Sequence, residues 1–190
     1  MIALHITGDD AADALLSSDP FALLVGMLLD QQVAMETAFA GPEKIRERLG
    51  RIDPGALAAL DPERLVTVFK QPPAVHRYPG SMAGRVQSLC AAVEQDWGGD
   101  ASAIWTQGSP TGPEVLKRLK ALPGFGEQKA RIFVALLGKQ YGFDGEGWRE
   151  AAGSYGEEGT FRSVADIVSP ESLAKVRAFK REQKQAAAQA

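Results

Sequence analysis

A short glycine-containing turn between two apolar helical runs is the part of this sequence best suited to bind an anion. Leucines recur at near-helical spacing in residues 116–122, Pro123 to Gly126 interrupts the pattern, and a second periodic run occupies 127–139. Glycine tolerates positive φ and lets another backbone approach without a Cβ in between. Successive amides in such a turn, with the free N–H groups of the following helix, form a concave anion site. A phosphate of duplex DNA fits that chemistry.

Basic side chains surround this turn, although the chain as a whole is acidic. Between positions 114 and 139 the bases outnumber the acids; they are Lys117, Arg118, Lys120, Lys129, Arg131 and Lys139. The formal net charge is −3, but residues 1–70 hold eleven acids and six bases, so the remainder is slightly positive. A local basic patch can bind phosphate on an acidic protein, with modest non-specific affinity.

The elements that must position this turn are helices. At six positions a capping residue or a glycine followed by proline predicts a helix N-terminus. The pairs are Asp19-Pro20, Gly41-Pro42, Asp53-Pro54, Asp61-Pro62, Gly112-Pro113 and Ser169-Pro170. The apolar spacing predicts helices near 9–17, 20–29, 33–40, 42–49, 54–60, 62–69, 81–97, 101–106, 113–121, 127–139, 146–152 and 170–187. Only Ile2 to Ile6 suggests a short strand, so we expect an all-α fold.

Composition excludes several classes of protein. The 45% hydrophobic and 24% charged content is typical of a globular chain. Cys90 is the only cysteine, which rules out a four-cysteine iron–sulfur cluster or zinc site. His5 and His76 lack cysteine or carboxylate partners at ligand spacing. No apolar run reaches membrane-spanning length and no signal peptide opens the chain, so we expect a cytoplasmic protein without a membrane partner.

The segment LPGFGEQKA at 122–130 resembles the hairpin of the helix-hairpin-helix (HhH-GPD) superfamily of DNA glycosylases, which is named for that hairpin followed by a Gly/Pro-rich loop and an acidic residue. Residues 21–39 resemble the family's apolar helix, Gln-containing loop and next helix, and residues 78–97 resemble the helix before the hairpin region. The agreement runs from Pro20 to Trp148, roughly two thirds of the chain. It implies two helical lobes, 20–130 and 1–19 plus 131–190, with a cleft between them.

The resemblance implies contacts to double-stranded DNA. The hairpin contacts map to Gly124, Phe125, Gly126, Gln128 and Lys129. In relatives a residue of the Gln-containing loop enters the duplex beside the extruded nucleotide, and Gln32 matches that position. A glutamine amide can replace base-pair hydrogen bonds lost on extrusion. The alternative is one unbroken helix through Asp30, Gln31 and Gln32, because glutamine is a good helix former.

A monovalent cation, Na⁺ or K⁺, is held by hairpin carbonyls in many relatives. The resemblance maps these carbonyls to Lys120, Leu122 and Phe125. Apart from such a structural ion, no cofactor is implied. At the C-terminus, bases alternate with alanine and glutamine over 175–184, which indicates a solvated helix face. His76-Arg77-Tyr78 is a second candidate contact to the DNA backbone.

The resemblance also places the reacting groups. Strand-cutting relatives carry a nucleophilic lysine two residues after the second hairpin glycine, and Gln128 stands there. Lys129 is adjacent, but one residue along a helix turns a side chain by about 100°, so we expect it to face a phosphate. The family carboxylate maps to Glu146 by ungapped counting, with Asp144 in reserve, although the expected Val-Asp pair is absent. The alternative is a solvated loop whose glutamate caps the next helix.

These observations predict a monofunctional DNA glycosylase that uses water to release a damaged base from duplex DNA. Trp148 and Tyr141 lie close in sequence to the expected carboxylate and are the candidates for lining the base pocket. The QQV sequence at 31–33 resembles members that remove alkylated purines. We expect a monomer. The alternatives are a catalytically inactive DNA-binding protein of the same fold, and a helical protein–protein adaptor without a DNA role.

Overall fold

The fold is all-α. A computed structural model describes residues 2–190 and contains no strand within them. The helices are α1 (Asp10–Ser18), α2 (Pro20–Leu29), α3 (Met35–Leu49), α4 (Pro54–Ala59), α5 (Pro62–Lys70), α6 (Pro79–Trp97), α7 (Ala103–Thr106), α8 (Gly112–Lys120), α9 (Glu127–Gln140), α10 (Trp148–Ala152) and α11 (Pro170–Gln189), with short 3₁₀ turns η1 (Gly153–Gly156) and η2 (Val164–Asp166). The all-α prediction is confirmed.

The predicted aspartate and serine caps begin their helices as expected. Asp19 accepts from the amides of Phe21 and Ala22 at the start of α2, and Asp53 and Asp61 do the same for α4 and α5. Each of these helices has proline at its first position, where the missing N–H costs no intrahelical bond. Short-range capping chemistry therefore sets these N-termini.

Two sequence predictions fail for reasons of packing. Gly41-Pro42 does not start a helix, because α3 runs through it as one helix with Pro42 inside. A Cβ at Gly41 would lie 2.6 Å from Leu29 Cδ1, so close contact with α2 selects glycine there. Ile2 to Ile6 forms no strand. The amide of Ile6 donates to the carboxylate of Asp13 on α1, so that segment is bonded to a helix rather than to a neighbouring strand.

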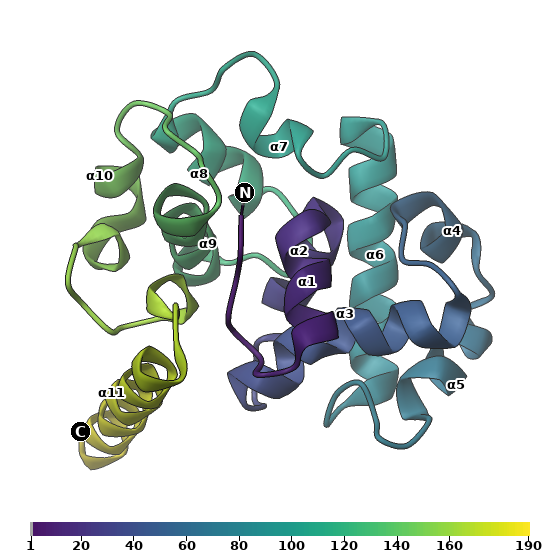
Figure 1. Cartoon of the computed structure of the whole chain (residues 1–190). Coiled ribbons are helices and arrows are strands. Elements are labelled where there is room, and N and C mark those ends of the chain that lie inside the picture. The colour runs from purple at the N-terminus through teal and green to yellow at the C-terminus, as the bar shows by residue number, and fades with distance from the viewer. Residues whose placement is uncertain (1) are drawn as a thin grey trace.

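Helix α2 is the centre of the molecule (Figure 1). Every residue from Phe21 to Leu29 is buried, so it has no solvent-facing side. Gly26 admits the ring of Phe39 on α3; a Cβ there would lie 2.6 Å from that ring. The turn between α8 and α9 packs on the same helix, since a Cβ at Gly124 would lie 2.3 Å from Leu28 Cδ1. The hairpin is thus docked against the C-terminal half of α2.

The helices form two groups on either side of α2 (Figure 1). Helices α3 to α6 lie on one side, while α10, η1 and η2 pack against α9 on the other. Helix α1 packs on α2 and α3, and the Tyr141 hydroxyl at the end of α9 donates to the Leu16 carbonyl of α1 at 3.2 Å. The N-terminal segment therefore contacts both groups, and the lobe boundaries expected from the sequence stay a prediction.

No single helix within residues 2–190 is long and apolar enough to cross a membrane; α1 and α2 pass such a test only as a pair, bent by 117°.

Candidate active site and DNA-binding hairpin

The hairpin turn presents backbone amides to solvent. The first hydrogen bond of α9 is from the Ala130 amide to the Gly126 carbonyl, and Gly126 carries no side-chain cap. The amides at 126–129 therefore have no partner among the described residues. Gly126 has φ −74° and no atom within 4 Å of a built Cβ, so its outer side is open. Of the two hairpin glycines, only Gly124, at φ 83°, needs the left-handed region. An anion can approach these amides as the sequence suggested.

The Phe125 side chain is buried. It therefore does not support the DNA contact expected at this residue. It is 4% exposed, and its ring packs edge-on against Phe133 with centroids 6.2 Å apart. Its amide donates to the Leu122 carbonyl at 3.2 Å, one of the three carbonyls expected to hold a cation. Phe125 therefore anchors the turn, and the monovalent cation stays a prediction. No group of three or more His, Cys, Asp or Glu side chains in residues 2–190 is arranged to hold a metal ion.

The basic patch around the hairpin is smaller than its sequence suggests, because most of its members have structural partners. Arg131 donates to the Ala151 carbonyl and to Glu127, and Lys139 bonds the buried Asp166 at 2.6 Å. Arg118 donates to two carbonyls next to α7 and stacks over the Trp97 ring at 5.3 Å. The hydrogen bond from Arg131, together with nearby Lys120, lowers the pKa of Glu127. Backbone amides are therefore the main anion-binding groups of the turn.

The loop after α2 is held in place by side chains from distant segments. Lys129 on α9 donates to the carbonyls of Met27 at 2.9 Å and Leu28 at 3.0 Å, and lies 3.4 Å from that of Asp30. Because three acceptors occupy its ammonium group, Lys129 is directed away from any phosphate, which corrects the expectation from the sequence. Burial lowers the pKa of Lys129 to about 8. Lys129 thus adds to the hydrogen bonds at the C-terminus of α2, where the Asp30 amide also donates to Met27 and the Gln31 side chain to Leu28.

His76 completes this arrangement from the segment before α6. Its Nε2 lies 3.1 Å from the Leu29 carbonyl and 2.9 Å from that of Gln31, and its Nδ1 accepts from the Tyr78 amide. This network assigns the proton to Nε2. Gln32 follows with φ 59° and an exposed side chain. The loop therefore interrupts the helices, which excludes one unbroken helix, and it leaves the Gln32 side chain exposed to solvent.

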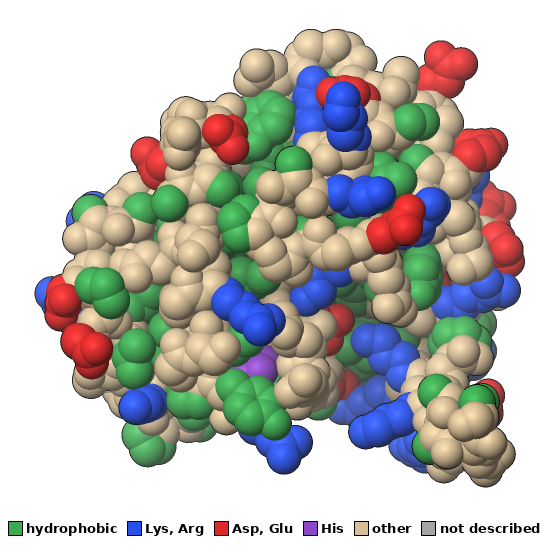
Figure 2. Space-filling view, turned by 180° about the vertical axis from the view of Figure 1, so that it is seen from behind, with side chains coloured by type: hydrophobic (Ala, Val, Ile, Leu, Met, Phe, Trp, Pro, Cys, Tyr) green, Lys and Arg blue, Asp and Glu red, His purple; other side chains and the backbone are tan. Residues whose placement is uncertain are grey.

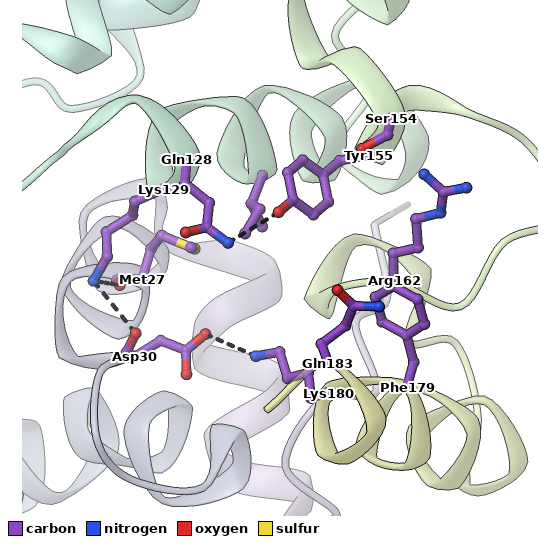
Figure 3. A pocket seen from close by; sticks show the side chains of 11 residues that line it. Met27, Asp30, Gln128, Lys129, Ser154, Tyr155, Arg162, Phe179, Lys180 and Gln183 are labelled. Carbon is purple, nitrogen blue, oxygen red and sulfur yellow. Dashed lines mark hydrogen bonds and ion pairs between the residues drawn. The ribbon is translucent and has the colours of Figure 1, made fainter. Parts of the chain in front are cut away.

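A cleft of about 600 Å³ opens between α2, α9, η1 and α11. It is lined by Met27, Asp30, Gln128, Lys129, Ile132, Ser154, Tyr155, Arg162, Phe179, Lys180 and Gln183 (Figure 3). Gln128 donates to the Tyr155 hydroxyl at 3.0 Å on one wall, and Lys180 reaches Asp30 Oδ2 at 3.6 Å on the other. Figure 2 shows basic side chains gathered beside the projecting C-terminal helix. The cleft adjoins the hairpin because the first turn of α9, which follows the hairpin turn, contributes Gln128 and Lys129 to the cleft wall.

One carboxylate lines the cleft, and it is Asp30 rather than Glu146 or Asp144, which were expected from the sequence. The Asp30 side chain is 9% exposed, and burial raises its pKa against the opposing effect of Lys180 and Lys129. The carboxylate expected at Glu146 is exposed and lines none of the cavities described, while its backbone carbonyl accepts from the Gly112 amide at 2.8 Å. Asp144 lines a separate hollow beside Trp105 and Pro110. Neither predicted carboxylate reaches the cleft.

The chain after α9 turns away from the cleft for a local reason. The amides of Tyr141 and Phe143 both donate to the Leu137 carbonyl, and Gly142 between them has φ 80°. Phe143 is buried by this turn. Gly145 then lies so close to Pro110 that a Cβ would come within 2.5 Å of its carbonyl oxygen. This αL helix ending directs residues 143–147 toward the start of α8.

The aromatic residues expected in the base pocket are structural. A Cβ at Gly138 would lie 2.4 Å from the Trp148 ring, so that ring packs flat on α9, and Arg149 covers it at 4.5 Å. Tyr141 donates to α1, and burial raises its pKa to about 12. The aromatic side chains of the cleft are Tyr155 and Phe179. Leu173, Val176 and Phe179 form an apolar stripe on α11 at i, i+3 and i+6, and this spacing could have indicated that Phe179 faces inward. The bases at 175–184 had instead indicated a solvated helix face.

The architecture is that of an all-α protein whose helix-hairpin-helix turn borders a polar cleft. The family model of the HhH-GPD superfamily base excision DNA repair proteins matches residues 25–189. The match covers the hairpin, the Gln32 loop and the whole of α11. The chain therefore belongs to the HhH-GPD superfamily of base excision DNA repair proteins, and the recognition made from LPGFGEQKA is confirmed. No curated protein matches it closely.

Proposed function

We propose that this protein is a monofunctional DNA glycosylase that binds duplex DNA as a monomer and hydrolyses the N-glycosidic bond of an alkylated base. The observation that carries the proposal is the position of the cleft, which shares the first turn of α9 with the hairpin and lies beside the Gln32 loop. A phosphate held at the hairpin and a glutamine inserted into the stack leave the extruded nucleotide next to this opening. Its volume of about 600 Å³ is in the range of ligand pockets.

The cleft chemistry favours a cationic base. Alkylation of a purine ring nitrogen gives the base a positive charge, so it departs as a neutral molecule without needing a general acid. Tyr155 and Phe179 offer π-faces, which attract cations, and Asp30 supplies the negative charge. The use of water rather than a lysine as the nucleophile is supported by the side chains at the start of α9. Gln128 replaces the lysine of strand-cutting relatives, and Lys129 is bonded to three carbonyls.

The test is incubation with duplexes that carry single alkylated purines, followed by hot alkali to cut at abasic sites. We expect base release from at least one lesion, strand cutting only after alkali, and no protein–DNA adduct on borohydride treatment. An adduct that persists in Lys129→Ala but disappears in Lys180→Ala would contradict the hydrolytic course, because Lys180 is the other amine of the cleft.

A second candidate is a catalytically inactive DNA-binding protein of the same fold. It is favoured by one observation, which is that neither Glu146 nor Asp144 reaches the cleft. Duplex binding without release of any alkylated base would support it over the glycosylase. Loss of both binding and release would favour an adaptor that acts on proteins.

A further inference from the structure

We propose that Asp30 at the end of α2 is the carboxylate that faces the reacting sugar, and that Lys180 of α11 positions it. This proposal rests on the proposed function and assigns its central residue. It differs from the sequence expectation, which placed the carboxylate after α9. Among the side chains that line the cleft, Asp30 is the only Asp or Glu (Figure 3).

Asp30 differs from the other buried carboxylates in how it is bonded. Asp13 accepts from the amides of Ile6 and Thr7 and from the Thr7 hydroxyl, which satisfies it. Asp166 bonds Lys139 at 2.6 Å and accepts from the Arg162 amide at 2.8 Å. Within residues 2–190 the Asp30 carboxylate has no hydrogen bond of ordinary length, and its one polar partner is Lys180, 3.6 Å from Oδ2. Its lone pairs are open to the cleft and lack short hydrogen bonds, so they are available to a ligand that enters it.

A capping role does not account for Asp30. The helix that follows, α3, has Ala34 at its N-cap and no side-chain cap bond, so the Asp30 carboxylate does not close it. The carbonyls at the end of α2 are bonded by Lys129 and His76 instead. Burial raises the pKa of Asp30, and Lys180 and Lys129 offset this only in part, so its ionised form costs the fold free energy.

The position of Asp30 suits both halves of the hydrolysis. As the bond between C1′ and the base nitrogen breaks, its electron pair leaves with the cationic base, which becomes neutral. Positive charge then develops on C1′ and the ring oxygen, where a nearby carboxylate stabilises it. Water adds through its oxygen to C1′, and its proton passes to Asp30 and on to solvent. The products are the free base and an abasic sugar with a hydroxyl group at C1′.

Lys180 is a positioning residue because it acts through Asp30. Its Nζ lies 3.6 Å from Oδ2, and it opposes the effect of burial on the carboxylate. Helix α11 is held over the cleft by a second ion pair, between Arg177 and Glu36 of α3. The first pair joins the C-terminal helix to the loop that carries Asp30 and Gln32, and the second joins it to α3, which follows that loop.

The test uses two duplexes that differ only in charge at the sugar. One carries a pyrrolidine abasic analogue, whose protonated nitrogen mimics the developing cation, and the other carries neutral tetrahydrofuran. We expect the full-length protein to prefer the pyrrolidine duplex by roughly 10²-fold, because catalytic sites bind the charge of the transition state. Asp30→Asn should abolish this preference while leaving tetrahydrofuran binding unchanged. Asp30→Ser is the second variant, should the amide perturb the loop.

Matched controls separate Asp30 from the other acids. Glu146→Gln and Asp144→Asn remove the exposed carboxylates and should keep the full preference. Lys180→Ala should reduce the preference and Lys180→Arg should restore it, since arginine supplies the same charge. A structural role for Lys180 would instead weaken binding of both duplexes equally.

Three results would overturn the proposal: a wild-type protein without preference, Asp30 variants that retain it, or its loss in Glu146→Gln. The measurement does not depend on knowing the lesion. A preference that requires Asp30, together with no base release from any alkylated duplex, would refute the proposed function while leaving the Asp30 assignment intact.

Discussion

At the scale of single residues, neighbours decide the chemistry of each ionisable group. Lys129 and Gln128 are adjacent, but one closes helix α2 while the other faces the cleft. Asp30 and Asp166 are both largely buried, yet only Asp166 has hydrogen bonds and a close cation. Because of this difference, we expect replacement by asparagine to raise the Tm at Asp30 and to lower it at Asp166.

Asp30→Asn should raise the thermal stability of the protein at neutral pH. The folded-state pKa of Asp30 lies above the ordinary value of 3.8 for an aspartate, so the folded protein holds this proton more tightly than the unfolded chain. Ionised Asp30 therefore costs stability above its folded pKa, and the cost vanishes as pH falls to the unfolded value. The Tm advantage of the variant should narrow in acid. Thermal melts across the pH range measure it, and a lower Tm for Asp30→Asn at neutral pH would contradict the interpretation.

Asp166→Asn is the matched control with the opposite sign. It leaves Lys139, whose side chain is 12% exposed, without its charged partner. Breaking a buried pair in this way costs about 3 kcal/mol, so the Tm should fall by several degrees. Equal effects of the two substitutions would mean that hydrogen bonding does not distinguish these carboxylates.

At the scale of elements, the hairpin turn combines one glycine that the fold requires with one that the fold leaves open to solvent. Gly124 has φ 83° and packs on Leu28, so any side chain there strains the turn. Gly126 has an extended conformation, φ −74° and ψ 177°, with open space outside it. Only the second position can be changed without disturbing the fold.

Gly126→Val should therefore weaken duplex binding without unfolding the protein. Valine accepts this backbone conformation, and its methyl groups would cover the amides at the start of α9. Affinity should fall for any duplex sequence, and the slope of log K against log salt should flatten by about 0.9 for one lost phosphate contact. Filter binding at several salt concentrations measures this, with circular dichroism as the check on folding. An unchanged slope would remove the phosphate from the turn.

Two further variants bracket that result. Gly124→Ala should lower Tm, because its Cβ would lie 2.3 Å from Leu28 Cδ1. Arg51→Ala removes an exposed base that pairs only with Asp53, away from the hairpin, and should leave the salt slope unchanged.

At the scale of the whole molecule, the cleft forms between segments from near the two ends of the chain, the end of α2 and helix α11. Asp30 comes from its C-terminus, and Phe179 and Lys180 come from the last helix of the chain (Figures 1 and 3). Helix α11 is buried at Val176 but exposed along its last turns. Phe179, Lys180 and Gln183 of α11 line the cleft, and the exposed residues from 185 onward do not.

Removing residues 185–190 should leave stability and base release unchanged. These residues are all exposed and lie beyond Lys184, the last residue that lines a cavity. Removing residues 170–190 takes away Val176, Phe179 and Lys180, so base release should be lost and Tm lowered, while the hairpin keeps its amides. Release assays and binding of undamaged duplex measure the two effects. Release that survives the longer truncation would place the reaction outside this cleft.

The sequence by itself determined the all-α class, most helix starts and the hairpin. These depend on short-range chemistry, such as an aspartate before a proline or a glycine that must adopt φ 83°. The family match over residues 25–189 agrees with the recognition made from those motifs. Pro42 marks the limit of such rules, because packing against α2 carried the helix through it.

Only the tertiary structure decided which carboxylate and which aromatic rings enter the cleft. The direction of residues 141–147 depends on Gly142 turning the chain toward α8, so counting along the sequence placed Glu146 where no cleft lies. Asp30 and Lys180 are 150 positions apart and meet because side chains of α11 reach the loop that follows α2. Side-chain neighbours this distant in sequence follow from how the helices pack, and burial among them is what sets the chemistry of Asp30.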